Sequence, residues 1–268
     1  MRSQPSRSRS RSAQAWLAAA VCIGHFVVAV EQAGAARWQP RPGATWQWQL
    51  TVPVDSTVDA DVYDIDGFDN SAALVRRLHA QGRRVICYID AGAYESYRPD
   101  AHRFPRSVLG RRNPPWTGER WLDIRRLDVL GPIMRARLDM CRAKGFDGVE
   151  LDEIDGFTNK TGFPLTANDQ LRYNKFLARE ARMRGLAAGM KNDVGQIRRL
   201  LSSFDFAINE QCFQFRECSR LRPFIAVGKA VFHVEYNQPT AAFCRVTARL
   251  GFSSMRKRLA LDAWRDPC

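Results

Sequence analysis

The stretch from Gly145 to Phe157, GFDGVELDEIDGF, constrains the fold of this chain more than any other segment. A short apolar strand pattern leads directly into a cluster of carboxylates, namely Glu150, Asp152, Glu153 and Asp155. In parallel α/β barrels the C-terminal ends of the strands form the active site. The stretch therefore predicts a parallel α/β protein that uses carboxylates for its chemistry.

Short β-rich runs alternate with helical patterns from Thr45 onward, which is typical of βαβ units. The predicted strands are Thr45–Thr51, Ala60–Asp66, Arg84–Ala91, Gly148–Glu153, Ala187–Lys191, Phe204–Asn209, Ala230–Glu235 and Ser254–Leu259. The predicted helices are Asn70–Gln81, Val129–Lys144, Asn168–Arg184, Gln196–Leu201 and Thr240–Leu250. Eight strands in 268 residues favour a single (β/α)8 TIM-type barrel over residues 37–268, rather than an open doubly wound sheet.

The first 36 residues are predicted to be a secretory signal peptide rather than part of the barrel. An Arg/Ser-rich start leads into the apolar run Ala15–Val30, and small residues follow, so we expect cleavage near Ala35 or Ala36. The apolar run is shorter than a spanning helix requires, which argues against stable membrane insertion. A signal that is retained as an anchor is the alternative.

The charge and the cysteines fit an exported protein. Removal of residues 1–35 takes away four Arg and one Glu, so the formal net charge falls from +13 to +10. The arginines are scattered along helices, which is typical of solvated faces, and no nucleic-acid-binding motif accompanies them. Six cysteines remain, and Cys212 with Cys218 and Cys244 with Cys268 could form disulfides. Cys87 could equally be a buried free thiol.

The sequence lacks the motifs that are typical of several kinds of enzyme chemistry. There is no phosphate-binding GxxxxGK[ST] loop, no GxGxxG after a first strand and no GxSxG, so nucleotide and serine-hydrolase chemistry are not indicated. We expect no cofactor. The sequence also indicates no metal, because it has neither a CxxC pair nor clustered histidines. A Mg²⁺ site at Asp152, Glu153 and Asp155 is the metal alternative.

Polar groups follow nearly every predicted strand. The strand ends supply Asp64, Asp66, Asp69, Tyr88, Asp90, Lys191, Asn192, Asp193, Asn209, Glu210, Glu235, Tyr236 and Asn237. Some of them have structural explanations: Asp69–Asn70 and Asn192–Asp193 could cap helices, and Asp155–Gly156 could form a turn. Convergence from six strands on one barrel mouth nevertheless favours a site.

A glycoside hydrolase typically needs two carboxyl groups, one on either side of the glycosidic bond that it cleaves. Asp152 and Glu210 end the fourth and sixth predicted strands, so they can reach one substrate from neighbouring sides. The segment Gly92–Arg120 is long for a connection and contains four prolines and several aromatic residues. We interpret it as an ordered loop that packs or binds.

The chain resembles glycoside hydrolase family 114, the endo-α-1,4-polygalactosaminidase-like group of TIM barrels. The resemblance extends from about Thr45 to Tyr236 and rests on TWQWQL, YDIDGFD, CYIDAG, GERWLDIR, GFDGVELDEIDGFTNKTGF, GMKND, FDFAINEQC and GKAVFHVEY. It implies hydrolysis of α-1,4-linked galactosamine-containing polysaccharide by a secreted enzyme. It also favours a local disulfide between Cys212 and Cys218.

The resemblance also implies roles for individual residues. Asp152 and Glu210 would be the catalytic carboxylates, with Glu210 as general acid/base and Asp152 as nucleophile or base. The substrate contacts would be Asp66, Tyr88, Lys191, Asn192 and Glu235. The family acid of the fourth strand is often followed by Asn, whereas this chain has Glu153, which strand alternation predicts to point away from the site.

The expected partner is therefore a polysaccharide substrate, with neither nucleic acid nor membrane as a stable partner. Two alternatives remain at this point. One is a secreted carbohydrate-binding barrel without catalysis, which would need the aromatic and amide groups but no carboxylate pair. The other is a glycosidase that acts on a different amino-sugar polymer.

Overall fold

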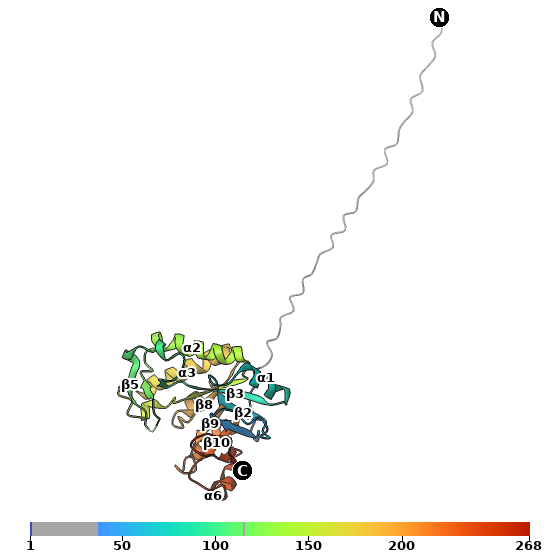
Figure 1. Ribbon diagram of the computed structural model, residues 1–268, viewed down its shortest axis with the longest axis vertical. Coiled ribbons are helices and arrows are strands. Elements are labelled where there is room, and N and C mark those ends of the chain that lie inside the picture. The colour runs from blue at the N-terminus through green and yellow to red at the C-terminus, as the bar shows by residue number, and fades with distance from the viewer. Residues whose placement is uncertain (2–36, 115) are drawn as a thin grey trace. The chain divides into compact units, whose positions relative to one another are not determined.

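The computed structural model describes Met1, residues 37–114 and residues 116–268 (Figure 1). Residues 37–268 form one compact unit, and the predicted signal peptide lies outside the described residues. The main sheet has the order β1-β2-β3-β7-β8-β9-β10-β11-β12, and every neighbour in it up to β11 is parallel. Its strands are β1 (Trp46–Gln49), β2 (Val62–Asp66), β3 (Arg84–Asp90), β7 (Gly148–Asp152), β8 (Ala187–Lys191), β9 (Phe206–Glu210), β10 (Val231–Glu235), β11 (Ser253–Arg256) and β12 (Asp266–Pro267).

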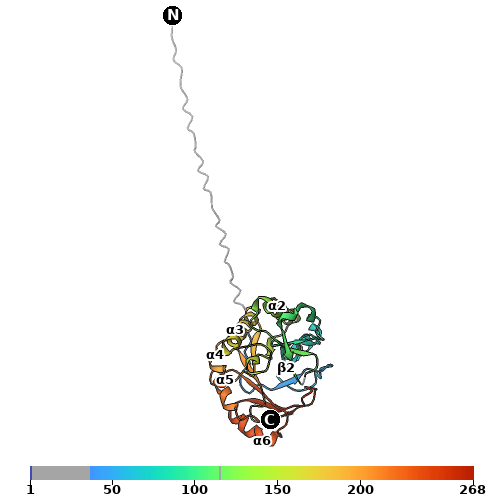
Figure 2. The ribbon, with the colours of Figure 1, turned by 90° about the vertical axis from the view of Figure 1, so that its left-hand side faces the viewer.

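Helices lie outside the strands, as a (β/α)8-type barrel requires. Figure 2 shows α2 to α6 following one another around the rim, with β2 near the centre. The helices are α1 (Ala72–Ala80), α2 (Leu127–Lys144), α3 (Ala167–Met183), α4 (Ile197–Leu200), α5 (Arg222–Ala226) and α6 (Thr240–Arg249), with short 3₁₀ turns at Ala101–Arg103, Arg106–Val108, Gly156–Thr158 and Cys218–Leu221. The predicted fold class is therefore confirmed. Within the described residues, no helix combines the length and the apolar character needed to cross a membrane.

Local sequence accounts for the helix boundaries. Thr166 and Asp169 form a capping box at the start of α3. Ser71, rather than Asp69 or Asn70, caps α1 by accepting a hydrogen bond from the Leu74 amide. Gly145 ends α2 with φ of 92°, a backbone conformation that favours glycine.

Alternation along each strand divides the apolar residues into two cores. On β2, Tyr63 and Ile65 belong to the core between strands and helices, whereas Val62 belongs to the core inside the barrel. The inward face of this strand continues from Val62 to Asp64 and Asp66, because successive side chains point to opposite faces. Its inward side chains thus change from apolar to acidic toward the C-terminal end, where a barrel site forms.

The segment between β3 and α2 contains a second, antiparallel sheet of order β4-β6-β5. Its strands are β4 (Ala93–Glu95), β5 (Leu109–Arg112) and β6 (Glu119–Leu122). The predicted ordered loop is therefore a small sheet, which we call the inserted sheet. Gly92 anchors it closely to the loop after β7, since a Cβ at that position would lie 1.7 Å from the Glu153 carbonyl oxygen.

The first and last parallel strands meet without a backbone ladder between them. Trp46 of β1 donates its indole N–H to the carbonyl of Ser253, and Arg265 donates to the carbonyl of Trp46. The amide of Leu50 also donates to the carbonyl of Leu261. The segment that follows β11 therefore closes the barrel.

Three disulfides join the six cysteines of residues 37–268. They are Cys87–Cys141, Cys212–Cys218 and Cys244–Cys268. Of the two roles left open for Cys87, the buried free thiol is thus the wrong one: Cys87 on β3 is bonded to Cys141 on α2, 54 residues further along the chain. Disulfides of this kind persist in oxidising compartments.

Candidate active site

The C-terminal ends of the parallel strands surround a cavity of about 480 Å³, which we call the first cavity. Its walls combine strand ends with parts of the inserted sheet. Among the residues that line it are Trp48, Asp66, Tyr88, Glu95, Tyr97, Trp116, Glu119, Asp152, Glu153, Asp155, Lys191, Asn192, Glu210 and Tyr236. The structure thus brings together four of the five predicted substrate contacts and both predicted catalytic carboxylates.

Lys191 links the two predicted catalytic carboxylates. Its Nζ lies 2.9 Å from Oδ1 of Asp152 and 3.1 Å from Oε2 of Glu210. These two oxygens are therefore at most about 6 Å apart. Burial acts against the charge of Lys191, but the surrounding carboxylates outweigh it and raise its pKa well above the usual range. Lys191 is consequently a fixed cation between the two acids.

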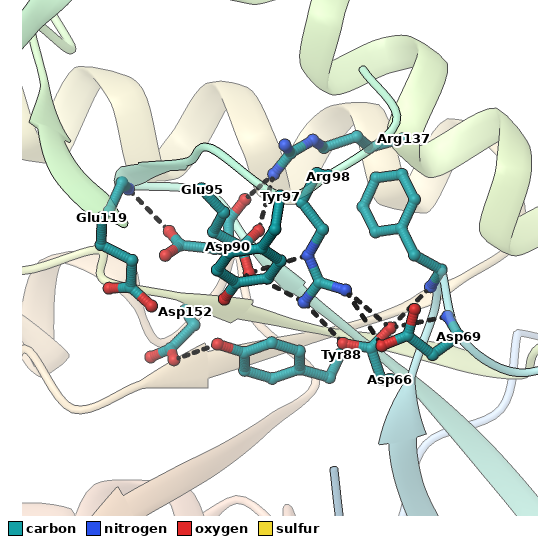
Figure 3. Close-up of polar contacts among 12 residues, drawn as sticks. Asp66, Asp69, Tyr88, Asp90, Glu95, Tyr97, Arg98, Glu119, Arg137 and Asp152 are labelled. Atoms are coloured by element: carbon teal, nitrogen blue, oxygen red, sulfur yellow. Dashed lines mark hydrogen bonds and ion pairs between the residues drawn. The ribbon is translucent and has the colours of Figure 1, made fainter. Parts of the chain in front are cut away.

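Each carboxylate also receives a hydrogen bond from a tyrosine. Tyr88 donates to Oδ2 of Asp152 at 2.9 Å (Figure 3), and Tyr236 donates to Oε1 of Glu210. Burial, together with the neighbouring carboxylate, raises the pKa of both tyrosines well above the usual range, so both remain proton donors. Asn192 adds a hydrogen bond from Nδ2 to Glu210 at 3.2 Å.

A second pair of carboxyl groups lies beneath Lys191, fully buried inside the barrel. Glu150 lies 3.2 Å from Nζ of Lys191, and burial raises its pKa to about 7. Burial and the charge of Glu150 raise the pKa of Asp64 well above its usual range. Burial therefore favours the protonated form of both carboxyl groups. The carboxylate cluster of the sequence included Glu150, but its role beneath Lys191 was not predicted.

The inserted sheet adds an acidic wall to the first cavity. Asn113 donates to Oε2 of Glu119 at 3.1 Å and to Oε1 of Glu153 at 3.0 Å. Burial, with the charge of Glu95, raises the pKa of Glu119 to about 7. The prediction that Glu153 points away from the site is wrong, because β7 ends at Asp152 and Glu153 has φ of 57°. Strand alternation no longer applies to Glu153, which lines the cavity.

Asp66 lines the cavity, but both of its carboxylate oxygens already accept hydrogen bonds from other groups of the protein. Arg98 donates to both of them, at 3.0 and 2.6 Å, and the amides of Phe68 and Asp69 donate to Oδ1 (Figure 3). Arg98 also donates to Glu95 of β4 at 2.8 Å. Asp66 therefore holds the inserted sheet against β2, and its direct contact with a substrate stays a prediction.

The sequence predicted Glu235 as a substrate contact, but the structure places its side chain outside the first cavity. Its side chain is completely buried and does not line the first cavity. Its Oε1 accepts hydrogen bonds from the amide of Phe213 at 2.8 Å and lies 2.9 Å from Nε2 of His233. Glu235 therefore supports the loop after β9 and does not contact a substrate in the cavity.

Metal-ligating groups form one compact set among the described residues, at Cys212, Cys218 and His233. The two sulfurs of this set are joined in a disulfide, so they are not available as thiolate ligands. Asp152, Glu153 and Asp155, the metal alternative of the sequence, do not form such a set. Asp152 instead accepts hydrogen bonds from Lys191 and Tyr88, and Glu153 accepts one from Asn113.

The carboxyl group of Asp193, near the first cavity, makes the free energy of unfolding depend on pH. Burial and the charge of Asp155 raise its pKa to about 8. The folded state therefore binds a proton that the unfolded state has already lost, and this contribution to stability decreases as the pH rises from about 4 to about 8.

We therefore expect Asp193→Asn to raise Tm relative to the unmodified protein by an amount that grows between pH 5 and pH 8. The Asn side chain can still accept the hydrogen bond from Asn174. Thermal unfolding across this range measures the difference. The exposed Asp128→Asn is the control, for which no such gain is expected. A Tm difference for Asp193→Asn that does not change with pH would contradict this explanation.

A (β/α)8 barrel with two carboxylates facing one cavity at its C-terminal mouth defines the class of barrel hydrolases that cleave glycosidic bonds. Residues 27–268 match glycoside-hydrolase family GH114. The chain belongs to this family and is a glycoside hydrolase.

Solved structures and a further sequence are similar to this chain. Ega3 of Aspergillus fumigatus, whose crystal structure is a complex with galactosamine, has a TM-score of 0.82 and 38% sequence identity, and the match covers 87% of this chain and 98% of Ega3. The glycoside hydrolase domain of PelA from Pseudomonas aeruginosa shares the fold, with a TM-score of 0.65 and 14% identity over 84% of this chain and 98% of that domain. A protein of Deinococcus radiodurans is 31% identical over 216 residues, which are 70% of this chain and 67% of that protein.

Proposed function

We propose that this protein cleaves galactosamine-containing polysaccharide outside the cell, with Asp152 as nucleophile and Glu210 as general acid/base. The observation that carries the proposal is the bridge that Lys191 makes between these two carboxylates in an open cavity. The similarity to Ega3, whose structure contains galactosamine, supports the sugar. The three disulfides support an oxidising compartment.

The acids of the cavity suit a cationic substrate. Glu95, Glu119 and Asp155 line the first cavity together with the catalytic pair. An ammonium group on the sugar would stabilise the ionised forms of these buried carboxyls, several of which have raised pKa values. A polymer that carries free amino groups therefore fits the cavity better than a neutral or an acidic polymer.

The contacts of the two acids support their assigned roles. Asp152 accepts hydrogen bonds from Lys191, from Tyr88 and from the Glu153 amide at 2.8 Å. Three donors, one of them cationic, suit a carboxylate that attacks the anomeric carbon. Glu210 is the more exposed of the two side chains, so it is better placed to protonate a leaving oxygen.

The proposal is tested by measuring reducing ends released from partly deacetylated galactosamine polymer, from its fully N-acetylated form and from a glucosamine polymer. We expect release from the first substrate and little from the other two. Release from the glucosamine polymer alone would show that the enzyme acts on a different amino-sugar polymer. Binding without release from any polymer would favour a carbohydrate-binding barrel without catalysis.

The distance between the carboxylates predicts the stereochemistry. Retaining glycosidases place their carboxyls about 5–5.5 Å apart, whereas inverting enzymes need about 6.5–9.5 Å to admit a water molecule. The two oxygens that contact Lys191 are at most about 6 Å apart, which is below the inverting range, and on this basis we predict retention. Proton NMR during the first minutes of cleavage should show the α-anomer before it mutarotates. A β-anomer as first product would show inversion and contradict the nucleophilic role of Asp152.

A further inference from the structure

A second cavity, of about 390 Å³, adjoins the first on the side of the loop after β9. Asp155, Asn192 and Glu210 line both cavities. Glu210 therefore stands where the two spaces meet, and the groove continues past it in both directions. A single sugar unit bound at Asp152 and Glu210 would leave this second cavity unused.

Exposed aromatic side chains line both cavities. Among the described residues, the large aromatic side chains that are exposed are Tyr97, Trp116 and Phe215. Tyr97 and Trp116 line the first cavity, and Phe215 lines the second. Phe215 is 60% exposed, so its ring contributes little to the core and offers an apolar face to the groove. Apolar ring faces of this kind can pack against the C–H face of a sugar.

The loop that carries Phe215 is held in place from both sides. The Cys212–Cys218 disulfide closes it, and the buried carboxylate of Glu235 accepts a hydrogen bond from the Phe213 amide near its start. Gln211 and Arg216 have φ of 62° and 57°, conformations that cost energy for residues other than glycine. A loop that is fixed in this way binds with a smaller loss of entropy than a mobile one.

Polar groups of the second cavity suit the same kind of sugar as the first. Asp155, whose pKa is raised to about 6 mainly by burial, faces both spaces. Glu217 and Gln211 lie further along, beside Arg220. The cavity thus offers carboxylates to an amino group and amide or guanidinium donors to hydroxyls.

We propose that the second cavity is a substrate subsite in which Phe215 stacks on an amino-sugar unit, on the far side of Glu210 from the first cavity. This inference rests on the proposed function. It gives Glu235 and the Cys212–Cys218 disulfide an indirect role as positioning groups, since they hold the Phe215 loop. It also predicts that the protein distinguishes long oligosaccharides from short ones.

The test compares Phe215→Ala with the unmodified protein on galactosamine oligosaccharides of increasing length. We expect KM for the longest oligomers to rise roughly tenfold, a factor equivalent to about 1.4 kcal/mol. The shortest oligomer that is cleaved should show no change. Phe215→Tyr should restore most of the affinity, because it keeps the ring. Val246→Ala, on the exposed face of α6, is the control that should change neither value.

Binding measured by isothermal titration calorimetry on the same oligomers separates this inference from the proposed function. A loss of affinity in Phe215→Ala that is confined to long oligomers supports the subsite, even if no polymer is cleaved. Equal affinities of both proteins for every length overturn it, even if the unmodified protein is active. Circular dichroism confirms that the variants are folded.

Discussion

Asp152→Asn and Glu210→Gln are each expected to lower kcat on galactosamine polymer by about 10³-fold or more. The first variant lacks a nucleophile and the second lacks a group that can exchange a proton with the leaving oxygen. Both substitutions preserve size and most hydrogen bonds, so binding of the polymer should be largely retained. Reducing-end release at matched concentrations of folded protein measures the loss.

The matched control is Asp69→Asn, a half-exposed carboxylate on the wall of the same cavity. We expect its activity to stay within a few-fold of the unmodified protein. Azide distinguishes the two roles in alanine variants: a retaining enzyme that lacks its nucleophile yields a glycosyl azide of inverted configuration, whereas one that lacks its acid/base yields the retained azide. Full activity in either Asn or Gln variant would remove that residue from the pair.

Lys191→Met should produce the second largest effect, a decrease in kcat of about 10²–10³-fold. Lys191 is 3% exposed in its side chain, contacts three carboxylates and lies over the Trp48 ring at 4.7 Å. Without this cation, the pKa of Glu150 should rise above about 7, because the charge of Lys191 lowers it in the unmodified protein.

Stability has to be separated from catalysis in this variant. Removal of one member of a buried ion group costs about 3–5 kcal/mol, so the assays need a temperature well below Tm. Lys144→Met is the matched control, since Lys144 does not line the first cavity and its Nζ donates to three backbone carbonyls of the loop after β2. That variant should lose stability and keep its kcat. An unchanged kcat in Lys191→Met would mean that the ammonium serves only the fold.

Most of the eight parallel strands could be predicted because they are short β-rich runs that end in a polar group, whereas β11, with the sequence SSMR, has the weakest pattern. The prediction also located Asp152, Glu210, Lys191 and Asn192 at one mouth, since parallel strands deliver their C-terminal residues to one face. The inserted sheet could not be predicted, because its strands have only three or four residues and prolines interrupt the pattern between them.

Contacts between side chains that are far apart in the sequence could not be predicted either. Arg98 donates hydrogen bonds to Asp66, which is 32 residues earlier in the chain, and Cys141 forms a disulfide with Cys87, which is 54 residues earlier. Glu235 resembles the other strand-end acids in sequence, yet it points to the buried side where His233 and the Phe213 amide meet it. Alternation along β10 places Glu235 on the face of Val231 in the outer core, opposite Phe232 and Val234 inside the barrel, and this local signal was not used in the prediction.

The position of the seam between β1 and β11 has a consequence for the order of folding. During synthesis β1 precedes by about 200 residues the segment that covers its free edge, and closing so long a loop is entropically unfavourable and slow. Until residues 253–268 dock, the core around Trp46 and Trp48 lacks Met255 and Leu261, and Trp46 lacks its hydrogen bonds with Ser253 and Arg265. We therefore expect the final folding step to be closure of this seam, and the open barrel to be the species that aggregates or needs a chaperone.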